Sequence, residues 1–197
     1  MFDQDDKVLK LFQDSDALLQ GHFKLTSGKH SEWYFEKIRL IEKPVVMDKI
    51  IDLLVEKIRR EVPDFDYVVS PAYGAIALGF LAALKLGKKF AFTQRVDEKM
   101  IFRSGFSGID GSRAVIVEDI LTTGGSINEV LACLKEHNVH PAGIYVLVDR
   151  SGGGVSIEGK PVGSLLSLKV EAFDPYVCPF CALDRPITKP GASDKKV

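Results

Sequence analysis

The stretch AVIVEDILTTGGSINEV, residues 114–130, places two acids directly before a run of small residues. Glu118 and Asp119 end an apolar segment typical of a buried strand, and residues 122–126 lead into a segment with helical spacing. Glycines let the backbone approach a ligand closely, and the N–H groups at a helix start bind anions together with neighbouring hydroxyls. The pattern predicts a site for a phosphate monoester. It lacks the lysine of a Walker A loop, so hydrolysis of a nucleoside triphosphate is not favoured.

The two acids need a separate explanation, because carboxylates repel a phosphate unless they hold a cation or accept hydrogen bonds from hydroxyls. Adjacent strand residues point to opposite faces, so at most one of the two carboxyl groups faces a buried layer while the strand continues. We therefore expect both acids at the rim of the site. A sugar phosphate with vicinal hydroxyls and a nearby Mg²⁺ would suit them. The alternative without a ligand is a solvated strand end before a glycine turn.

Short apolar segments alternate with helical patterns through the middle of the chain, which predicts an α/β fold. We expect strands at 67–70, 90–93, 114–118 and 142–148, and helices beyond Pro44, at 75–86 and at 125–137. Strands separated by helices pair in parallel through right-handed crossovers, giving a mostly parallel central sheet flanked by helices. Ligands bind such sheets beyond the carboxyl ends of the strands, where the two acids and the small residues fall.

The ends of the chain predict smaller elements around this core. Residues 4–20 have the spacing of a surface helix, residues 22–40 indicate two short strands joined by a turn at 26–29, and a hairpin is expected in 155–170. We expect a single domain of 197 residues with three regions. These are an N-terminal segment (1–43), the α/β core (44–150), and a C-terminal hairpin and tail packed on the same domain (151–197).

Composition excludes several classes of protein. With 46% hydrophobic residues, 27% charged residues and a net charge of −1, the chain has the balance of a soluble globular protein and no basic surplus for nucleic acid. The acidic N-terminus lacks the layout of a signal peptide, and no apolar run approaches the roughly 20 residues of a membrane helix. We expect a cytoplasmic protein without nucleic-acid or membrane partners.

Three cysteines are too few for a disulfide framework. Cys178 and Cys181 form a CPFC pair, which is half of a zinc site, and the sequence shows no second cysteine pair or clustered histidines to complete it. We interpret the pair as a tight turn with reduced thiols. Metal binding and redox chemistry are the alternatives.

The segment VIVEDILTTGGS resembles the phosphoribosyl-pyrophosphate (PRPP) signature of the type I phosphoribosyltransferases. The resemblance implies their fold, with Glu118 and Asp119 at the ribose hydroxyls and the small-residue turn at the 5-phosphate. The PRPP-binding residues that it implies in this segment are Glu118, Asp119, Ile120, Leu121, Thr122, Thr123, Gly124, Gly125 and Ser126.

Other segments are similar to those of orotate phosphoribosyltransferases. The N-terminal segment that forms a hood over the base site resembles GHFKLTSGKHSEWYFE (21–36). The loop beside the pyrophosphate resembles SPAYGAIALG (70–79), and a later strand that ends in arginine resembles VLVDR (146–150). The resemblance implies that Thr122 and Arg150 contact orotate and that Tyr34 and Phe35 line the base pocket. Arginine offers a planar fork to a carboxylate or carbonyl edge, and aromatic faces suit a pyrimidine. Taken alone, Arg150 would be a solvated strand-end residue.

The polar connection QRVDEKMIFRSGFSGIDGS (94–112) is long for a compact α/β domain and is a candidate lid. In orotate phosphoribosyltransferases the equivalent loop is mobile and carries basic residues to the pyrophosphate, often from the neighbouring subunit of a dimer. By this resemblance Arg95 and Lys99 are the catalytic cations and also bind PRPP, and Arg103 is a further basic residue of the loop. A solvated charged loop is the alternative.

Several basic residues common in bacterial relatives are absent. The chain has Thr26, Gly74 and Val96 where these relatives have lysines, and Ile101 where they have a loop histidine. The pattern instead resembles a shorter, loop-variant subgroup whose loop keeps an arginine and a lysine. A proton donor in the form of a loop histidine is therefore not expected, and Lys29 is a weaker candidate for pyrophosphate contact.

The resemblance implies transfer of the 5-phosphoribosyl group from PRPP to orotate, giving orotidine 5′-monophosphate and pyrophosphate in de novo UMP synthesis. It also implies Mg²⁺ as cofactor and a cytoplasmic homodimer. One alternative is a phosphoribosyltransferase for another base; a purine enzyme would lack the 21–36 segment and Arg150. The other is a PRPP-sensing regulatory protein of the same fold. Against it stand the missing basic surplus, the absence of an added helix-turn-helix segment and the presence of a charged lid.

Overall fold

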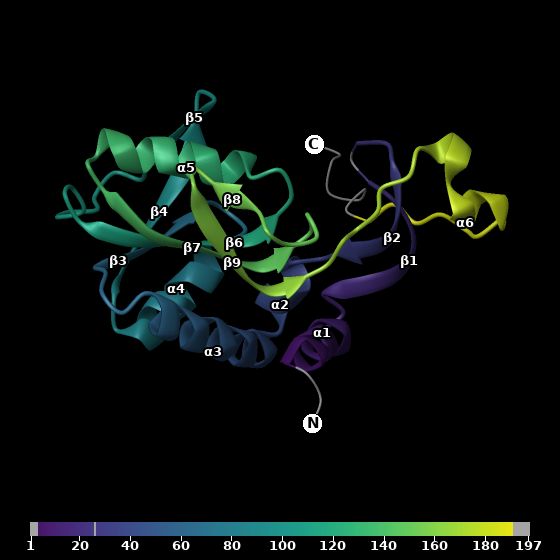
Figure 1. Cartoon of the computed structure of the whole chain (residues 1–197), viewed down its shortest axis with the longest axis horizontal. Helices are drawn as coiled ribbons and strands as arrows, with labels where there is room; N and C mark the ends of the chain where they lie inside the picture. Colours follow the sequence, from purple (N-terminus) through teal and green to yellow (C-terminus); the bar gives the residue numbers. More distant parts are fainter. Residues whose placement is uncertain (1–3, 26, 191–197) are drawn as a thin grey trace. The chain divides into compact units, whose positions relative to one another are not determined.

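The computed structural model describes residues 4–25 and 27–190, which form two compact units (Figure 1). The first unit combines the described residues up to Lys43 with those from Lys169 onward, and the second contains Pro44–Leu168. Thr26 lies outside the described residues. None of the helices in the described part has both the length and the apolar character that a membrane span requires. The three-part division expected from the sequence stays a prediction.

The second unit is built on a seven-stranded sheet with the order β5-β4-β3-β6-β7-β9-β8. Its strands are β3 (Tyr67–Pro71), β4 (Lys89–Val96), β5 (Lys99–Phe102), β6 (Arg113–Leu121), β7 (His140–Asp149), β8 (Ser156–Ile157) and β9 (Lys160–Ser167). The inner strands pair in parallel, and β5 and β8 at the edges run antiparallel to their neighbours. The mostly parallel sheet expected from the sequence is confirmed.

Helices cover both faces of this sheet (Figure 1). α3 (Pro44–Glu61) and α4 (Ile76–Leu86) lie on one face and α5 (Gly125–Glu136) on the other. The apolar residues of α3 recur every three or four positions and form one buried stripe, Met47, Ile50, Ile51, Leu54, Val55 and Ile58. α4 packs closely on β3, because a Cβ atom at Gly79 would lie 2.0 Å from Ser70 Oγ.

The strand order changes direction between β3 and β6. After β3 the chain forms β4 on one side and then returns to place β6 on the other side, with β7 beyond it. The connections that leave β3 and β6 therefore run to opposite faces of the sheet, through α4 and α5. Open α/β sheets bind ligands beyond the carboxyl ends of the strands at such a switch point.

The first unit contains a two-stranded hairpin and short helices from both ends of the chain. Its elements are α1 (Gln4–Asp14), β1 (Leu18–Lys24), β2 (His30–Phe35), α2 (Ile38–Glu42), the 3₁₀ helix η1 (Pro175–Val177) and α6 (Pro179–Ala182). β1 and β2 pair antiparallel, which confirms the hairpin expected from the sequence. The C-terminal segment adds a bridge at each edge, from Thr188 to Phe23 of β1 and from Phe173 to His30 of β2.

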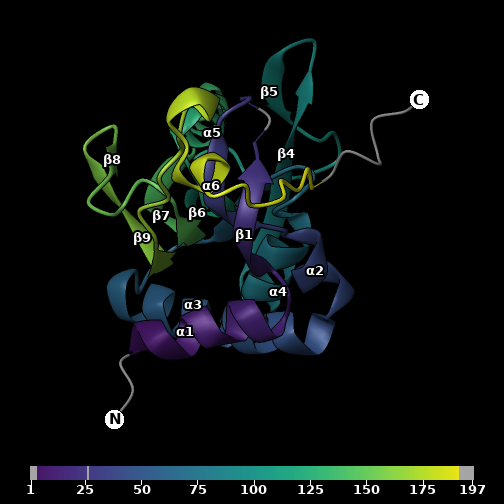
Figure 2. The same ribbon diagram turned by 90° about the vertical axis from the view of Figure 1, so that its right-hand side faces the viewer.

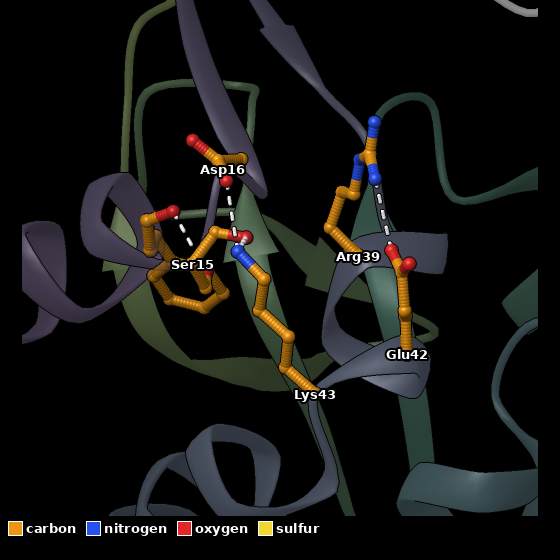
Figure 3. Close-up of polar contacts among 6 residues, drawn as sticks. Ser15, Asp16, Arg39, Glu42 and Lys43 are labelled. Atoms are coloured by element: carbon orange, nitrogen blue, oxygen red, sulfur yellow. Dashed lines mark hydrogen bonds and ion pairs between the residues drawn. The ribbon is translucent and has the colours of Figure 1, made fainter.

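The N-terminal helix is shorter than the spacing of its apolar residues predicts. It ends at Asp14, and the residues from Leu18 belong to β1. The chain leaves the helix through Asp16, which has a φ of 58°. Lys43 holds this turn by donating hydrogen bonds to the Ser15 carbonyl (2.9 Å) and the Asp16 carboxylate (2.8 Å) (Figure 3). The apolar pair Leu18 and Leu19 fits a helix or a strand equally well. Pairing with β2 places both residues in a strand.

The connection expected to be a single polar loop begins instead with a hairpin (Figure 2). β4 continues to a turn at Asp97 and Glu98, whose φ angles are 46° and 63°, and β5 returns antiparallel. Met100 is buried in the hydrophobic core and Phe102 packs against it. Met100 and Phe102 are two residues apart, so they share one face of β5 and anchor the strand on the core. The polar composition of the whole connection is therefore misleading at this point.

Candidate active site

β3, β6 and β7 are parallel, so the loops that follow them leave the sheet on the same side, at the carboxyl ends of the strands; we call this side the carboxyl edge. β6 and β7 stay paired to their last residues, Leu121 and Asp149. The Arg150 N–H donates a hydrogen bond to the Leu121 carbonyl at 2.9 Å. Arg150 and Thr122 therefore directly follow two paired strand ends, and the structure brings together these two residues that the sequence resemblance assigns to one substrate.

Glu118 and Asp119 do not lie at a solvated rim. β6 continues through both residues to Leu121, and their side chains are only 6% and 4% exposed. The expectation that at most one of the two carboxyl groups faces a buried layer was wrong, because helices cover both faces of the sheet and opposite-facing neighbours are both buried. Glu118 Oε1 accepts a hydrogen bond from the Asp119 N–H at 3.0 Å, and Asp119 Oδ1 accepts one from the Ile120 N–H at 2.7 Å.

Burial beside another carboxyl group perturbs the ionisation of Glu118. Desolvation, reinforced by the charge of Asp119, raises the pKa of Glu118 to about 8, while a hydrogen bond with Ser126 acts in the opposite direction. Near neutral pH the Glu118 carboxyl therefore keeps its proton for much of the time. A ligand that supplies hydroxyl donors or a cation would stabilise the ionised form, so this pair suits a polyol or a metal-bound anion.

The turn between β6 and α5 has the geometry of an anion site. Gly124 occupies the position before the helix with a φ of 80°, and its carbonyl accepts the first helical hydrogen bond, from the Asn128 N–H at 2.9 Å. The N–H groups of the first helical turn have no partner within the helix and carry its positive dipole end. Thr122 and Thr123 are exposed beside them. Backbone donors and hydroxyls thus gather as the sequence predicts for a phosphate.

Gly124→Ala is expected to destabilise the protein by about 1 to 3 kcal/mol, because the backbone there is left-handed and the site is crowded. A Cβ atom would lie 2.8 Å from Ile157 Cδ1. Gly111 is the matched control, since its φ of 74° is similar but a Cβ atom there would meet no other atom within 4 Å. Urea unfolding should show the larger loss for Gly124→Ala; equal losses in the two variants would mean that crowding by Ile157 is unimportant.

The two cations expected to reach the pyrophosphate are paired with acids of α5. Arg95 Nη2 lies 2.6 Å from Glu129 Oε2, and Lys99 Nζ lies 2.7 Å from Glu136 Oε1. Both cationic side chains are more than half exposed, and the ion pair with Glu129 raises the pKa of Arg95. Solvent screens exposed ion pairs, so these contacts hold the β4–β5 hairpin against α5 only weakly.

The aromatic residues expected at the base belong to the first unit. Phe35 is buried against Phe12, with ring centroids 5.4 Å apart, whereas Tyr34 is half-buried and its ring lies 5.7 Å from that of Phe23. Adjacent strand residues face opposite ways, which explains why only one of the pair enters the core of the unit. The role of both residues at a base stays a prediction.

Asp149 is a buried acid at this edge that sequence reasoning missed. Its side chain is 2% exposed, and Oδ1 accepts hydrogen bonds from the Ser151 N–H (2.8 Å) and hydroxyl (2.6 Å). These bonds fix the loop that begins with Arg150. The signal was present in VLVDR, where an acid precedes the arginine at the end of an apolar run.

The loop after β3 also lies at this edge. Its Ala72 N–H donates to the Thr93 carbonyl at 2.7 Å, the Ala72–Tyr73 peptide bond is cis, and Tyr73 is 85% exposed. A hollow of about 460 Å³ elsewhere in the second unit is lined by Tyr67, Lys89 and other residues at the amino ends of the strands. That position is the opposite end of the sheet from the acids, so the hollow is not the site described above.

Comparisons with known proteins agree with this geometry. A family model described as "Phosphoribosyl transferase domain" matches residues 40–176. The orotate phosphoribosyltransferase of Caldicellulosiruptor bescii is 37% identical over 190 residues, covering 96% of this chain and 98% of that one. The orotate phosphoribosyltransferase of Thermotoga petrophila is 38% identical over 189 residues, covering 96% and 100%.

A solved structure extends the likeness to three dimensions. The crystal structure of orotate phosphoribosyltransferase from Aeropyrum pernix matches with a TM-score of 0.67 and 27% identity, over 82% of this chain and 94% of that one. The sequence likeness therefore extends over nearly the whole chain, and the likeness in fold covers 82% of it. The chain belongs to the type I phosphoribosyltransferase family and, within it, to the orotate phosphoribosyltransferases.

Proposed function

We propose that the protein transfers the 5-phosphoribosyl group of PRPP to orotate, giving orotidine 5′-monophosphate and pyrophosphate in the de novo synthesis of UMP. The observation that carries the proposal is the buried pair Glu118 and Asp119, which stands directly before a phosphate-binding turn at the switch point of the sheet. Acids and anion donors so close together fit a single ligand that has both hydroxyls and a phosphate.

PRPP would occupy this edge with its ribose over the acids and its 5-phosphate in the turn. The ribose hydroxyls would donate hydrogen bonds to Glu118 and Asp119, which would offset the desolvation and the Asp119 charge that raise the pKa of Glu118. The 5-phosphate would accept bonds from the turn and helix start, Thr122, Thr123, Gly124, Gly125 and Ser126. Ile120 and Leu121 belong to the same segment and fix the position of the turn through the β6 ladder.

Orotate would bind at the neighbouring strand end. Arg150 supplies a planar cation for a carboxylate or a carbonyl edge, and Thr122 adds a hydroxyl from the paired strand. This arrangement is supported by the hydrogen bond that joins the Arg150 N–H to the Leu121 carbonyl. By the family resemblance Tyr34 and Phe35 would line the base pocket; within their own unit Phe35 packs on Phe12, whereas Tyr34 is half-buried.

The reaction is a substitution at the anomeric carbon, so positive charge develops on the ribose and negative charge on the departing pyrophosphate. Arg95 and Lys99 would stabilise that leaving group. Their side chains would first leave the ion pairs with Glu129 and Glu136 of α5 and then bind pyrophosphate oxygens. Breaking these two ion pairs costs little free energy because both are exposed to solvent. A closed lid would also exclude water, which otherwise hydrolyses PRPP. The protein needs no nucleophile of its own.

The acids also fit the cofactor expected for this family. Oxygen ligands are those that Mg²⁺ prefers, and Glu118 and Asp119 present carboxyl oxygens at the site. Bound with PRPP, Mg²⁺ would neutralise charge on the pyrophosphate. We further propose a homodimer in which the β4–β5 hairpin of one subunit contributes its basic residues to the site of the other. Family resemblance supports this proposal.

Purified protein with PRPP, Mg²⁺ and orotate is expected to consume orotate and release pyrophosphate, because each substrate has a complementary group at the site. EDTA should stop the reaction, and adenine, hypoxanthine and uracil should not replace orotate. The absorbance of orotate measures its consumption, and a coupled assay measures the pyrophosphate released. Reaction of another base with orotate untouched would disprove the specificity, and PRPP binding without any reaction would favour a sensor.

A further inference from the structure

Four side chains with metal-binding atoms converge in the first unit. His22 and His30 come from the β1–β2 hairpin, and Cys178 and Cys181 come from the C-terminal segment; we call them the His₂Cys₂ cluster. We propose that this cluster binds a zinc ion with a structural role. The proposal goes beyond the transferase reaction and does not depend on it, because no residue of the cluster belongs to the proposed substrate site.

The distances between the ligand atoms approach those of a tetrahedral site. His22 Nε2 lies 3.6 Å from Cys178 Sγ, 3.7 Å from Cys181 Sγ and 3.0 Å from His30 Nδ1. Cys181 Sγ lies 3.2 Å from His30 Nδ1, and all four atoms are within 4.8 Å of one another. Zinc–nitrogen and zinc–sulfur bonds of about 2.0 and 2.3 Å place neighbouring ligand atoms about 3.3 to 3.8 Å apart. Small shifts would therefore seat the ion.

The orientation of His22 fits metal ligation. Its Nδ1 atom lies 2.9 Å from the Arg185 carbonyl oxygen, which can only accept a hydrogen bond. Nδ1 therefore carries the proton, and Nε2 presents a lone pair to the other three ligand atoms. Histidines that bind zinc are commonly oriented by such a bond from the second ring nitrogen to a carbonyl.

Local structure explains why these residues meet. In the hairpin register Lys24 pairs with His30, and β1 has an irregularity between Gln20 and Phe23, where His22 lies. Such bulges redirect a side chain, and here the His22 ring lies beside that of His30, with centroids 4.9 Å apart. Cys178 is the residue before α6, with Pro179 at the first helical position, and Cys181 follows one turn later on the same side. The bridges at Thr188 and Phe173 hold the C-terminal segment along both edges of the hairpin.

The surroundings indicate a closed site. His22, His30 and Cys178 are only 5%, 6% and 3% exposed. The ring of Phe180 lies 5.7 Å from that of His22 and shields it. Four protein ligands leave no open position for a substrate, which is the pattern of a structural rather than a catalytic zinc site.

Ligand chemistry selects the metal. Thiolates and imidazoles favour zinc, whereas the Mg²⁺ expected with PRPP takes oxygen ligands. The ion would tie the hairpin to a segment 156 residues further along the chain, in a unit whose own core is small. The sequence shows no clustered histidines beside the cysteine pair, because the two histidines are distant in sequence and only the fold brings them to the cysteines.

Elemental analysis of the purified full chain tests the proposal. Wild-type protein is expected to hold about one zinc ion per chain, and Cys178→Ser with Cys181→Ser should lose it. Cys133→Ser is the matched control, because Cys133 is a buried thiol of the second unit and should leave the zinc content unchanged. Retention of zinc by the double variant would overturn the assignment of its ligands.

A second measurement remains informative if the double variant fails to fold. Removing metal from wild-type protein with a zinc chelator under reducing conditions should lower Tm, and Zn²⁺ but not Mg²⁺ should restore it. Co²⁺ added to the stripped protein should give thiolate charge-transfer absorption, also in Cys133→Ser. The site would be disproved if native protein without metal has a disulfide between Cys178 and Cys181. It would also be disproved if reduced protein with added Co²⁺ shows no cobalt–thiolate absorption. Failure of the orotate assay alone would not bear on it.

Discussion

Asp119→Asn is expected to lower kcat/KM for PRPP by about 100-fold or more without lowering the free energy of unfolding. Asparagine keeps the carbonyl oxygen that can accept from the Ile120 N–H, so β6 should retain its local geometry. It removes the negative charge that would bind ribose hydroxyls or Mg²⁺. Hydrogen bonds to charged groups are worth about 1.5 to 3 kcal/mol each, and two such bonds account for the expected loss.

Steady-state kinetics with varied PRPP and urea unfolding measure the two effects separately. Asp64→Asn is a suitable control, because Asp64 is exposed and pairs with Arg113 away from the carboxyl edge. The control should match wild type in kinetics. A large loss of stability in Asp119→Asn, with activity reduced only in proportion to unfolding, would show that Asp119 serves the fold rather than the substrate.

Glu118→Gln is expected to stabilise the protein by about 2 to 3 kcal/mol at pH 7 while reducing its activity. The pKa of Glu118 is raised from 4.5 to about 8 in the folded state by burial and by Asp119. Between these values the unfolded carboxyl group is ionised while the folded one holds its proton. The folded state therefore binds more protons, and stability falls as pH rises through this window. Glutamine has no charge to desolvate and removes the penalty.

The stabilisation should depend on pH in a defined direction. Denaturant titrations of wild type and variant are expected to differ little near pH 4.5 and increasingly towards pH 8. Glu56→Gln, at an exposed position of α3, is the control and should be nearly neutral throughout. A stability difference that does not grow with pH would mean that Glu118 is not protonated in the folded protein.

Together these two variants separate substrate binding from folding at one pair of residues. Buried acids that weaken the free protein are retained in functional sites because the ligand stabilises their ionised forms. A gain in stability combined with a loss of activity in Glu118→Gln is the signature of such a site. Saturating PRPP should narrow the stability gap, since it would favour the ionised wild-type side chain.

Local sequence was sufficient for the elements whose apolar pattern has one solution. The segment 114–130 identified a strand, an acid pair and a phosphate turn because these features are contiguous and the helix start follows directly. The long apolar stripe of α3 and the short apolar runs of the sheet were equally unambiguous. Resemblance of the same segment to the PRPP signature identified the family, and residues 21–36 with Arg150 identified its orotate branch.

Tertiary structure decided whatever depends on contacts between distant residues. The run around Leu18 fits a helix or a strand, and pairing with β2 selected the strand. The alternating pattern predicts helices on both faces of the sheet, but the burial of both Glu118 and Asp119 depends on how those helices pack on the end of β6. The cysteine pair found its histidines only through the packing of the C-terminal segment against the hairpin. Periodicity describes one element at a time, whereas burial, ionisation and ligand geometry arise when elements far apart in sequence pack together.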